Sequence, residues 1–189
     1  MTLSALGIFS AAGAGGAPVA AGSYELISST ILGSSQTSVS LNTTGLGSTY
    51  KHIQIRATMR TTEANNDGGN PFIRFNGDSG NNYAWHLLVS SGSTVVSSGD
   101  INAPSMLFGK PAGSSAASGN FGASVIDILD AFSTSKNKTH RSLSGHSNLQ
   151  VGAFSGHWRS TNAITSVDIF ANGPSFVAGS RFSLYGIKG

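Results

Sequence analysis

Histidine is the residue type in this sequence best suited to hold a metal ion or to carry a proton. No two histidines form a close pair such as His-x-His, and no His-Glu-x-x-His motif occurs. The chain also has no cysteine, which excludes disulfides, thiolate metal sites and cysteine nucleophiles. We therefore predict structural or surface histidines, with no metal and no other cofactor. The five are His52, His86, His140, His146 and His157.

Three aspartates, Asp67, Asp78 and Asp100, lie in or beside turn-rich segments, where a pair of carboxylates could hydrolyse a glycoside. For Asp67 and Asp78 the simpler interpretation is that each carboxylate accepts hydrogen bonds from the backbone of its own turn. No Gly-x-Ser-x-Gly elbow follows a parallel strand, and the oxygen spacing of a calcium loop is missing. The sequence predicts no catalytic residue, and a hydrolase is the least favoured function.

Two aromatic pairs could contact a glycan. Trp85 adjoins His86, and His157 adjoins Trp158. Rings of this kind stack on sugars where they are exposed, but large aromatic side chains more often pack in a core. Packing is the favoured interpretation, and glycan contact is the alternative.

The surface is expected to be polar but weakly charged. Charged residues make up 10% of the 189 residues, against roughly 25% in average soluble proteins. The eleven Lys and Arg and the eight Asp and Glu are scattered, giving a net charge of +3 without a basic run. We therefore expect no nucleic-acid partner. Since no apolar stretch approaches the roughly 18 residues that cross a bilayer, we expect no membrane span either.

Residues 53–60 give the clearest strand signal, because apolar and polar side chains alternate with a period of two. One face should pack, and the other should face water or a partner. Arg56 and Arg60 share the outward side, and Arg74 begins a similar polar side on a following strand. Arginine can form bidentate hydrogen bonds with a partner's carboxylates or carbonyls, so these three are candidates for a subunit interface. A solvated face is the alternative.

The rest of the sequence predicts short strands separated by turns rich in Gly, Asn and Asp. Strand signals occur at 24–32, 39–41, 72–75, 83–89, 124–129, 164–170 and 181–187, with a weaker one at 143–154. Residues 90–122 are expected to form a long loop holding one edge strand at 106–108. Such spacing favours an all-β, antiparallel β-sandwich, with a jelly roll preferred over a closed barrel.

Residues 1–22 are Gly/Ala-rich and are expected to form an extended N-terminal arm ahead of a single β-sandwich domain at 23–189. A secretory signal is the alternative, but no Lys or Arg precedes the apolar residues. An arm of this composition buries too little surface to order itself alone, so we expect it to dock on another protein. Its docking residues would be Leu3, Leu6, Ile8 and Phe9.

Four blocks together resemble a family of small virion proteins of tailed bacteriophages, described as tail-fibre-like or decoration-like. They are YELISS at 24–29, FNGD at 75–78 with NY at 82–83, WRSTNAITS at 158–166 and RFSLYGIK at 181–188. The resemblance covers roughly residues 23–189. It implies a trimer-forming or ring-forming β module without catalytic residues. It does not say where on the virion the protein attaches. The arm would set that position by contacting other virion proteins.

The resemblance and the composition together predict a non-enzymatic virion structural protein on the outside of a tail or capsid. A short tail fibre or spike that contacts the host surface, including a host glycan, is favoured. A capsid decoration, cement or head-fibre protein comes second. A carbohydrate-binding module from another setting is the alternative of a different class.

Overall fold

A computed structural model describes residues 22–146 and 150–189, which form two antiparallel sheets packed face to face as a sandwich. The predicted arm and its four docking residues lie outside this range. The described part has a single 3-10 turn, η1 (Leu46–Ser48), and none of its helices is long and apolar enough to cross a membrane. The strands are β1 (Tyr24–Ile31), β2 (Ser38–Asn42), β3 (His52–Met59), β4 (Pro71–Phe75), β5 (Tyr83–Ser91), β6 (Thr94–Ala103), β7 (Met106–Leu107), β8 (Gly122–Leu129), β9 (Lys138–His146), β10 (Gln150–Trp158), β11 (Ser166–Ala171) and β12 (Arg181–Ile187).

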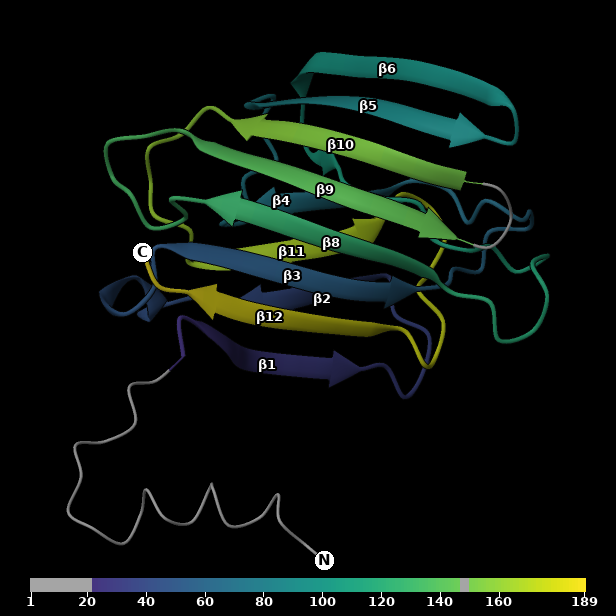
Figure 1. The fold of residues 1–189 in the computed structure, drawn as a ribbon, viewed down its shortest axis with the longest axis horizontal. Coiled ribbons are helices and arrows are strands. Elements are labelled where there is room, and N and C mark those ends of the chain that lie inside the picture. Colours follow the sequence, from purple (N-terminus) through teal and green to yellow (C-terminus); the bar gives the residue numbers. More distant parts are fainter. Residues whose placement is uncertain (1–21, 147–149) are drawn as a thin grey trace, which may run out of the picture.

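The sheets differ in width. The large sheet has eight strands in the order β1-β12-β3-β8-β9-β10-β5-β6, and the small sheet has four in the order β2-β11-β4-β7. Figure 1 shows the large sheet in front, with the small sheet behind its middle. Every neighbouring pair of strands is antiparallel. The all-β antiparallel sandwich predicted from the sequence is confirmed.

The core fills the space between the sheets. The apolar side of β3 is 0 to 3% exposed, as its alternation predicts, and it faces Ile73 and Ile169 of the small sheet within one cluster. Each buried Ile or Met side chain contributes about 1.5 to 3 kcal/mol relative to an exposed one. The sandwich is therefore held together mainly by hydrophobic packing.

Two segments differ from the sequence-based expectation. Residues 90–122 are not one long loop, because β5 runs on to Ser91 and β6 adds a ten-residue strand at the sheet edge. The weak signal at 143–154 is in fact a hairpin of two nine-residue strands, β9 and β10. The edge strand expected at 106–108 is present as β7, on the edge of the small sheet.

Candidate functional site

Asp78 is engaged by its own turn and by Trp158. Its Oδ1 accepts a hydrogen bond from the Gly80 backbone N–H at 2.9 Å and another from the Asn82 amide. Its Oδ2 accepts one from Trp158 Nε1–H at 2.7 Å. Partial burial opposes ionisation, yet the hydrogen bonds from Trp158, Asn82 and Gly80 hold the pKa of Asp78 below its usual value. The turn-capping role predicted for Asp78 is confirmed, and it is a structural role.

The same role predicted for Asp67 is wrong. Asn65 caps that turn instead, because its Oδ1 accepts hydrogen bonds from the backbone N–H groups of Asp67 and Gly68, both at 3.0 Å. The Asp67 carboxylate lies 3.5 Å from Lys110 Nζ and accepts a bond from Gln150 Nε2 at 3.3 Å. It therefore holds its loop against two distant segments.

The five histidines lie on four strands, and His86 and His157 are diagonal neighbours on the outer side of the paired strands β5 and β10. In residues 22–146 and 150–189 no group of three or more His, Asp, Glu or Cys side chains could hold a metal ion. His52 accepts a hydrogen bond through Nδ1 from the Asp130 backbone N–H at 2.8 Å. His140 is fully buried on the inner side of β9, and neither of its ring nitrogens has a hydrogen-bond partner. Burial lowers the pKa of His140 to about 4, so the ring is neutral at pH 7.

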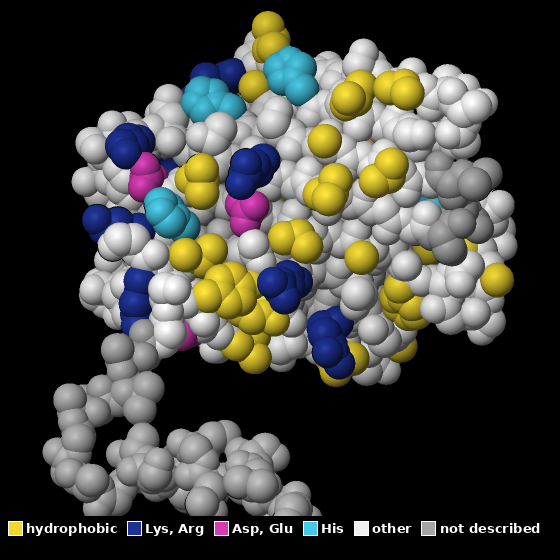
Figure 2. Space-filling model, in the orientation of Figure 1, with side chains coloured by type: hydrophobic (Ala, Val, Ile, Leu, Met, Phe, Trp, Pro, Cys, Tyr) yellow, Lys and Arg dark blue, Asp and Glu magenta, His cyan; other side chains and the backbone are white. Residues whose placement is uncertain are grey.

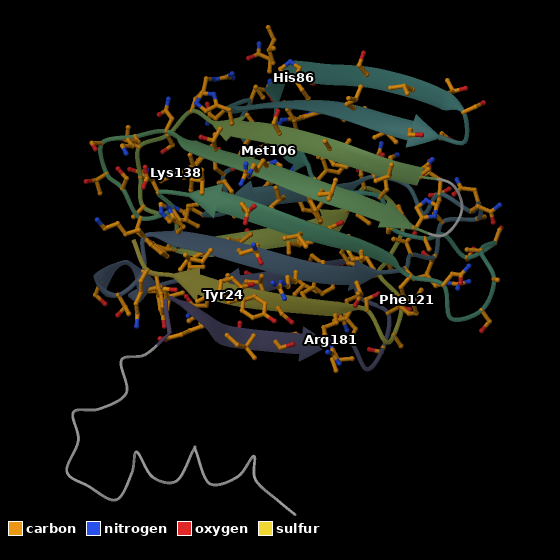
Figure 3. All side chains as sticks on the ribbon, viewed as in Figure 1. Tyr24, His86, Met106, Phe121, Lys138 and Arg181 are labelled. Carbon is orange, nitrogen blue, oxygen red and sulfur yellow. The ribbon has the colours of Figure 1, made fainter. Side chains whose placement is uncertain are left out.

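The two aromatic pairs cannot act as paired glycan contacts. Neighbouring residues of a strand point to opposite faces, so His86 is exposed on the outer side of β5 while Trp85 lies on the inner side (Figure 3). Trp158 is 2% exposed and packs against Tyr83 with ring centroids 6.2 Å apart. Trp158 is thus a core residue, and of the two tryptophans only Trp85 is accessible enough to contact a sugar.

The three arginines proposed as one interface do not share a face. Arg56 lies on the outer side of the large sheet, where its guanidinium stacks on the rings of Tyr24 at 5.4 Å and Tyr185 at 5.1 Å. Arg74 is on β4 of the small sheet, hence on the other side of the sandwich, and stacks on Phe170 at 4.5 Å. Two strands that follow each other in sequence can belong to different sheets, which the alternation pattern does not reveal.

Arg60 is used within the chain. Its guanidinium donates hydrogen bonds at 2.8 to 3.3 Å to four backbone carbonyls of the loop between β7 and β8. Those carbonyls belong to Ser114, Ala116, Ala117 and Asn120. A cation with four such acceptors holds the loop in place.

The outer face of the large sheet is unusually apolar. Leu143 on β9 pairs across strands with Val125 on β8, and both are exposed, Leu143 to 62%. Leu143, Val151, Leu88 and Val95 surround a shallow recess of about 260 Å³. Figure 2 shows hydrophobic side chains spread over the front of the molecule, where the large sheet lies. A patch of this kind commonly marks a contact surface.

Strand β6 is a long, unprotected sheet edge. Residues 94–102 are all exposed, including Val95 at 64% and Ile101 at 70%. The strand has no Lys, Arg or Pro, the residues with which proteins usually block edge pairing. The opposite edge, β1, has a register shift in its middle, between Leu26 and Ser28, whereas the shift in β6 lies near its end, beyond the pair Trp85 and Asp100, so residues 94–100 pair without interruption. Of the two edges of the large sheet, β6 is the better template for another strand.

A cleft of about 290 Å³ lies where β5 and β6 meet the small sheet. Phe72 and Phe170 stack there with centroids 5.9 Å apart, and Arg74 donates a hydrogen bond through Nε to the Pro104 carbonyl at 2.9 Å. Of the residues that line this cleft, sequence reasoning singled out Arg74, Trp85 and Asp100, each for a different reason. Both phenylalanines lie in predicted strand segments, but nothing in the sequence placed them beside β5. The residues that line the cleft include Phe72, Arg74, Trp85, Asp100, Phe170 and Asn172.

Comparison of the chain with family models, curated proteins and solved structures found no match. What is established is the class of fold, an antiparallel β-sandwich of two sheets.

Proposed function

We propose that the chain is a non-enzymatic structural subunit of a tailed-bacteriophage virion, most specifically a short tail fibre or spike. The observation that carries the proposal is the large sheet, which has an apolar outer face and the unprotected edge β6. Both features favour repeated assembly with other protein surfaces. The sequence resemblance to small phage virion proteins is the reason for placing the subunit in a phage virion. In this proposal residues 1–22 dock the subunit on another virion protein.

We also infer that the sandwich is a jelly roll with two added hairpins. Without β5–β6 and β9–β10, the sheets reduce to β1-β12-β3-β8 and β2-β11-β4-β7. Eight strands in two four-stranded sheets is the jelly-roll arrangement, which is common in viral capsid and lectin domains. The added hairpins extend the large sheet only, and they carry β6, Leu143 and Val151. The candidate contact surfaces thus lie largely on additions to a simpler fold.

Particle labelling tests the setting. Phage particles that contain a tagged copy of the chain should show the tag at the tail by gold-labelled electron microscopy. A particle that instead contains the copy lacking residues 1–22 should show no label, because that segment is the proposed anchor. Label on capsid faces or vertices would favour the decoration-protein alternative. Unchanged incorporation of the shortened copy would contradict the docking role of the arm.

The edge strand leads to a prediction about assembly. The purified chain should be a trimer by light scattering, with three times the 19.2 kDa mass of one copy. Replacing Val95 and Val96 with Lys places a charge on each face of the β6 edge, because successive residues alternate. This double variant should be monomeric. Its melting temperature should lie within a few degrees of the parent's, once the stability lost with the subunit contacts is allowed for.

A matched variant distinguishes strand pairing at the β6 edge from contact through the apolar face of the large sheet. Leu143→Lys adds a charge to the middle of the apolar face and leaves β6 unchanged. If only the β6 variant dissociates, the contact is strand pairing; if only Leu143→Lys dissociates, it is the sheet face. A dimer would indicate two-fold pairing of one β6 with another and would reject the trimer, since a three-fold ring needs two different surfaces. A monomeric parent chain would reject self-assembly.

A further inference from the structure

The cleft beside Trp85 exists because the large sheet is wider than the small one. Strand β7, only two residues long, ends the small sheet beneath β10 and β5, so the β5–β6 hairpin extends past it. The connection through Pro104 and Ser105 then turns round this edge. As a result, the outward side of the small sheet and the inner side of the hairpin line one recess. An added hairpin beside a rigid scaffold is a common position for a binding site.

The aromatic part of the recess is fixed by packing. Phe72 and Phe170 are cross-strand partners on β4 and β11, and their rings stack at an interplanar angle of 22°. Both are partly buried, as is Trp85, which packs against the core from the hairpin side. Such rigid rings offer apolar surface at little cost in conformational entropy.

The polar part supplies both donors and acceptors. The Arg74 side chain is held by Phe170 and by the Pro104 carbonyl, and in the described residues Nε is its only side-chain atom with a hydrogen bond. Its terminal N–H groups remain as donors. Asp100 accepts one hydrogen bond, from the Asn102 backbone N–H at 2.8 Å, and keeps acceptor capacity. The Asn172 side chain completes the lining.

We propose that this recess binds one neutral pyranose ring of a surface glycan. Aromatic rings beside convergent donors and acceptors match a sugar, which has an apolar ring face and a rim of hydroxyls. The charges disfavour an anionic sugar, because Asp100 lines the recess and Asp168 lies opposite Arg74 in the strand register, so the single cation is more than offset. The volume is at the small end for a ligand site, which fits one ring rather than a chain. If the subunit is a host-contacting spike, as proposed above, this would be its receptor contact.

The test uses the full-length chain and a panel of methyl glycosides of glucose, galactose, mannose and N-acetylglucosamine. Binding is measured by saturation-transfer NMR and by tryptophan fluorescence. At least one glycoside should bind with a dissociation constant of about 1 mM, the range expected for so small a ligand. The fluorescence change should come from Trp85, since Trp158, the other tryptophan, is buried.

Three variants locate the site. Trp85→Ala and Arg74→Ala should each weaken binding at least tenfold, and Asp100→Asn should weaken it severalfold. Arg181→Ala is the matched control, because Arg181 lies on the outer face of the large sheet (Figure 3) and its loss should leave binding unchanged. Melting curves check that each variant is folded; Arg74→Lys, which retains the charge, serves if the alanine variant is not.

The proposal would be overturned if no glycoside bound at a concentration 20 times the expected dissociation constant. Binding that survives both Trp85→Ala and Arg74→Ala would also overturn it, by placing the sugar elsewhere. Preference for a glycoside carrying a carboxylate would reject the neutral ligand in favour of an anionic one. None of these results bears on where the subunit sits in a particle, so the labelling experiment above decides the virion role separately.

Discussion

Lowering the pH from 7.5 to 5 is expected to destabilise the sandwich by about 2 kcal/mol, because His140 must remain neutral in the folded state. Its pKa is lowered by burial from 6.5 to about 4. The unfolded chain therefore binds a proton as the pH falls through 6.5, whereas the folded chain does so only near 4. The stability is fully present above pH 6.5 and is lost progressively between 6.5 and 4. Urea unfolding at a series of pH values measures it.

The variant His140→Leu isolates this effect, since leucine is similar in size and has no titrating group. Its free energy of unfolding should be nearly constant between pH 7.5 and 5. The depressed carboxylates, such as Asp78 and Asp130, lose their contribution only below about pH 4 and do not interfere in this window. His86→Gln, at an exposed position, should retain the parent's pH dependence. An equally steep loss in His140→Leu would show that another group is responsible.

The strands that sequence analysis identified are those whose buried side is apolar. In β3 the apolar residues alternate without a break, and all are buried, so the pattern is visible in the sequence. Strand β12 shows the same pattern at Phe182 and Leu184. In β8 the pattern is partial, because Ile126 and Ile128 face the core but Ser124 is buried beside them and Val125 is exposed. Hydrophobic burial alone decides the orientation of such strands.

Strand β9 was only partly recognised because its inner side is polar. Lys138, His140, Ser142 and Ser144 all point inward and are buried. Lys138 Nζ donates to three backbone carbonyls, at 2.7, 2.7 and 3.2 Å, and Ser142 Oγ donates to the Phe108 carbonyl at 2.6 Å. Two of the acceptors, on Ser133 and Lys136, belong to the loop just before β9, and the other two, on Thr161 and Phe108, belong to segments distant in sequence. A pattern of hydrophobicity cannot predict burial that depends on partners supplied by the tertiary fold.

Only some residues of the candidate site could be predicted, again because the tertiary fold decides which residues meet. Trp85 and Arg74 were singled out by residue type, but each was placed in the wrong group, Trp85 with His86 and Arg74 with Arg56. Membership of a sheet decides which residues meet, and it depends on strand order rather than on local alternation. Strand β6 was missed because residues 94–102 are exposed on both faces and so carry no alternating pattern. Its contacts are pairing with β5 and, near its end, hydrogen bonds from Arg159 to the Ile101 carbonyl and the Asn102 side chain, none of which a hydrophobic pattern reveals.

Replacing Trp158 with Ala is expected to cost about 4 kcal/mol in stability, among the largest effects of any single substitution in this chain. The indole is 2% exposed, stacks against Tyr83, and meets Phe75 edge-on with centroids 5.6 Å apart. Its removal leaves a cavity and also takes the Nε1–H donor away from Asp78. For a domain of this size the melting temperature should fall by roughly 10 °C, measured by circular dichroism.

Two companion variants divide this loss into its parts. Trp158→Phe retains most of the ring packing but removes the hydrogen bond to Asp78, and Asp78→Asn weakens the same bond while leaving the indole in place. Each should cost less than half of the alanine substitution, because burial of the large ring is the dominant contribution. Trp85→Ala, at a partly buried position, should cost less again and should affect sugar binding instead. If Trp158→Ala lost sugar binding with an unchanged melting temperature, the assignment of Trp158 to the core and of Trp85 to the cleft would be reversed.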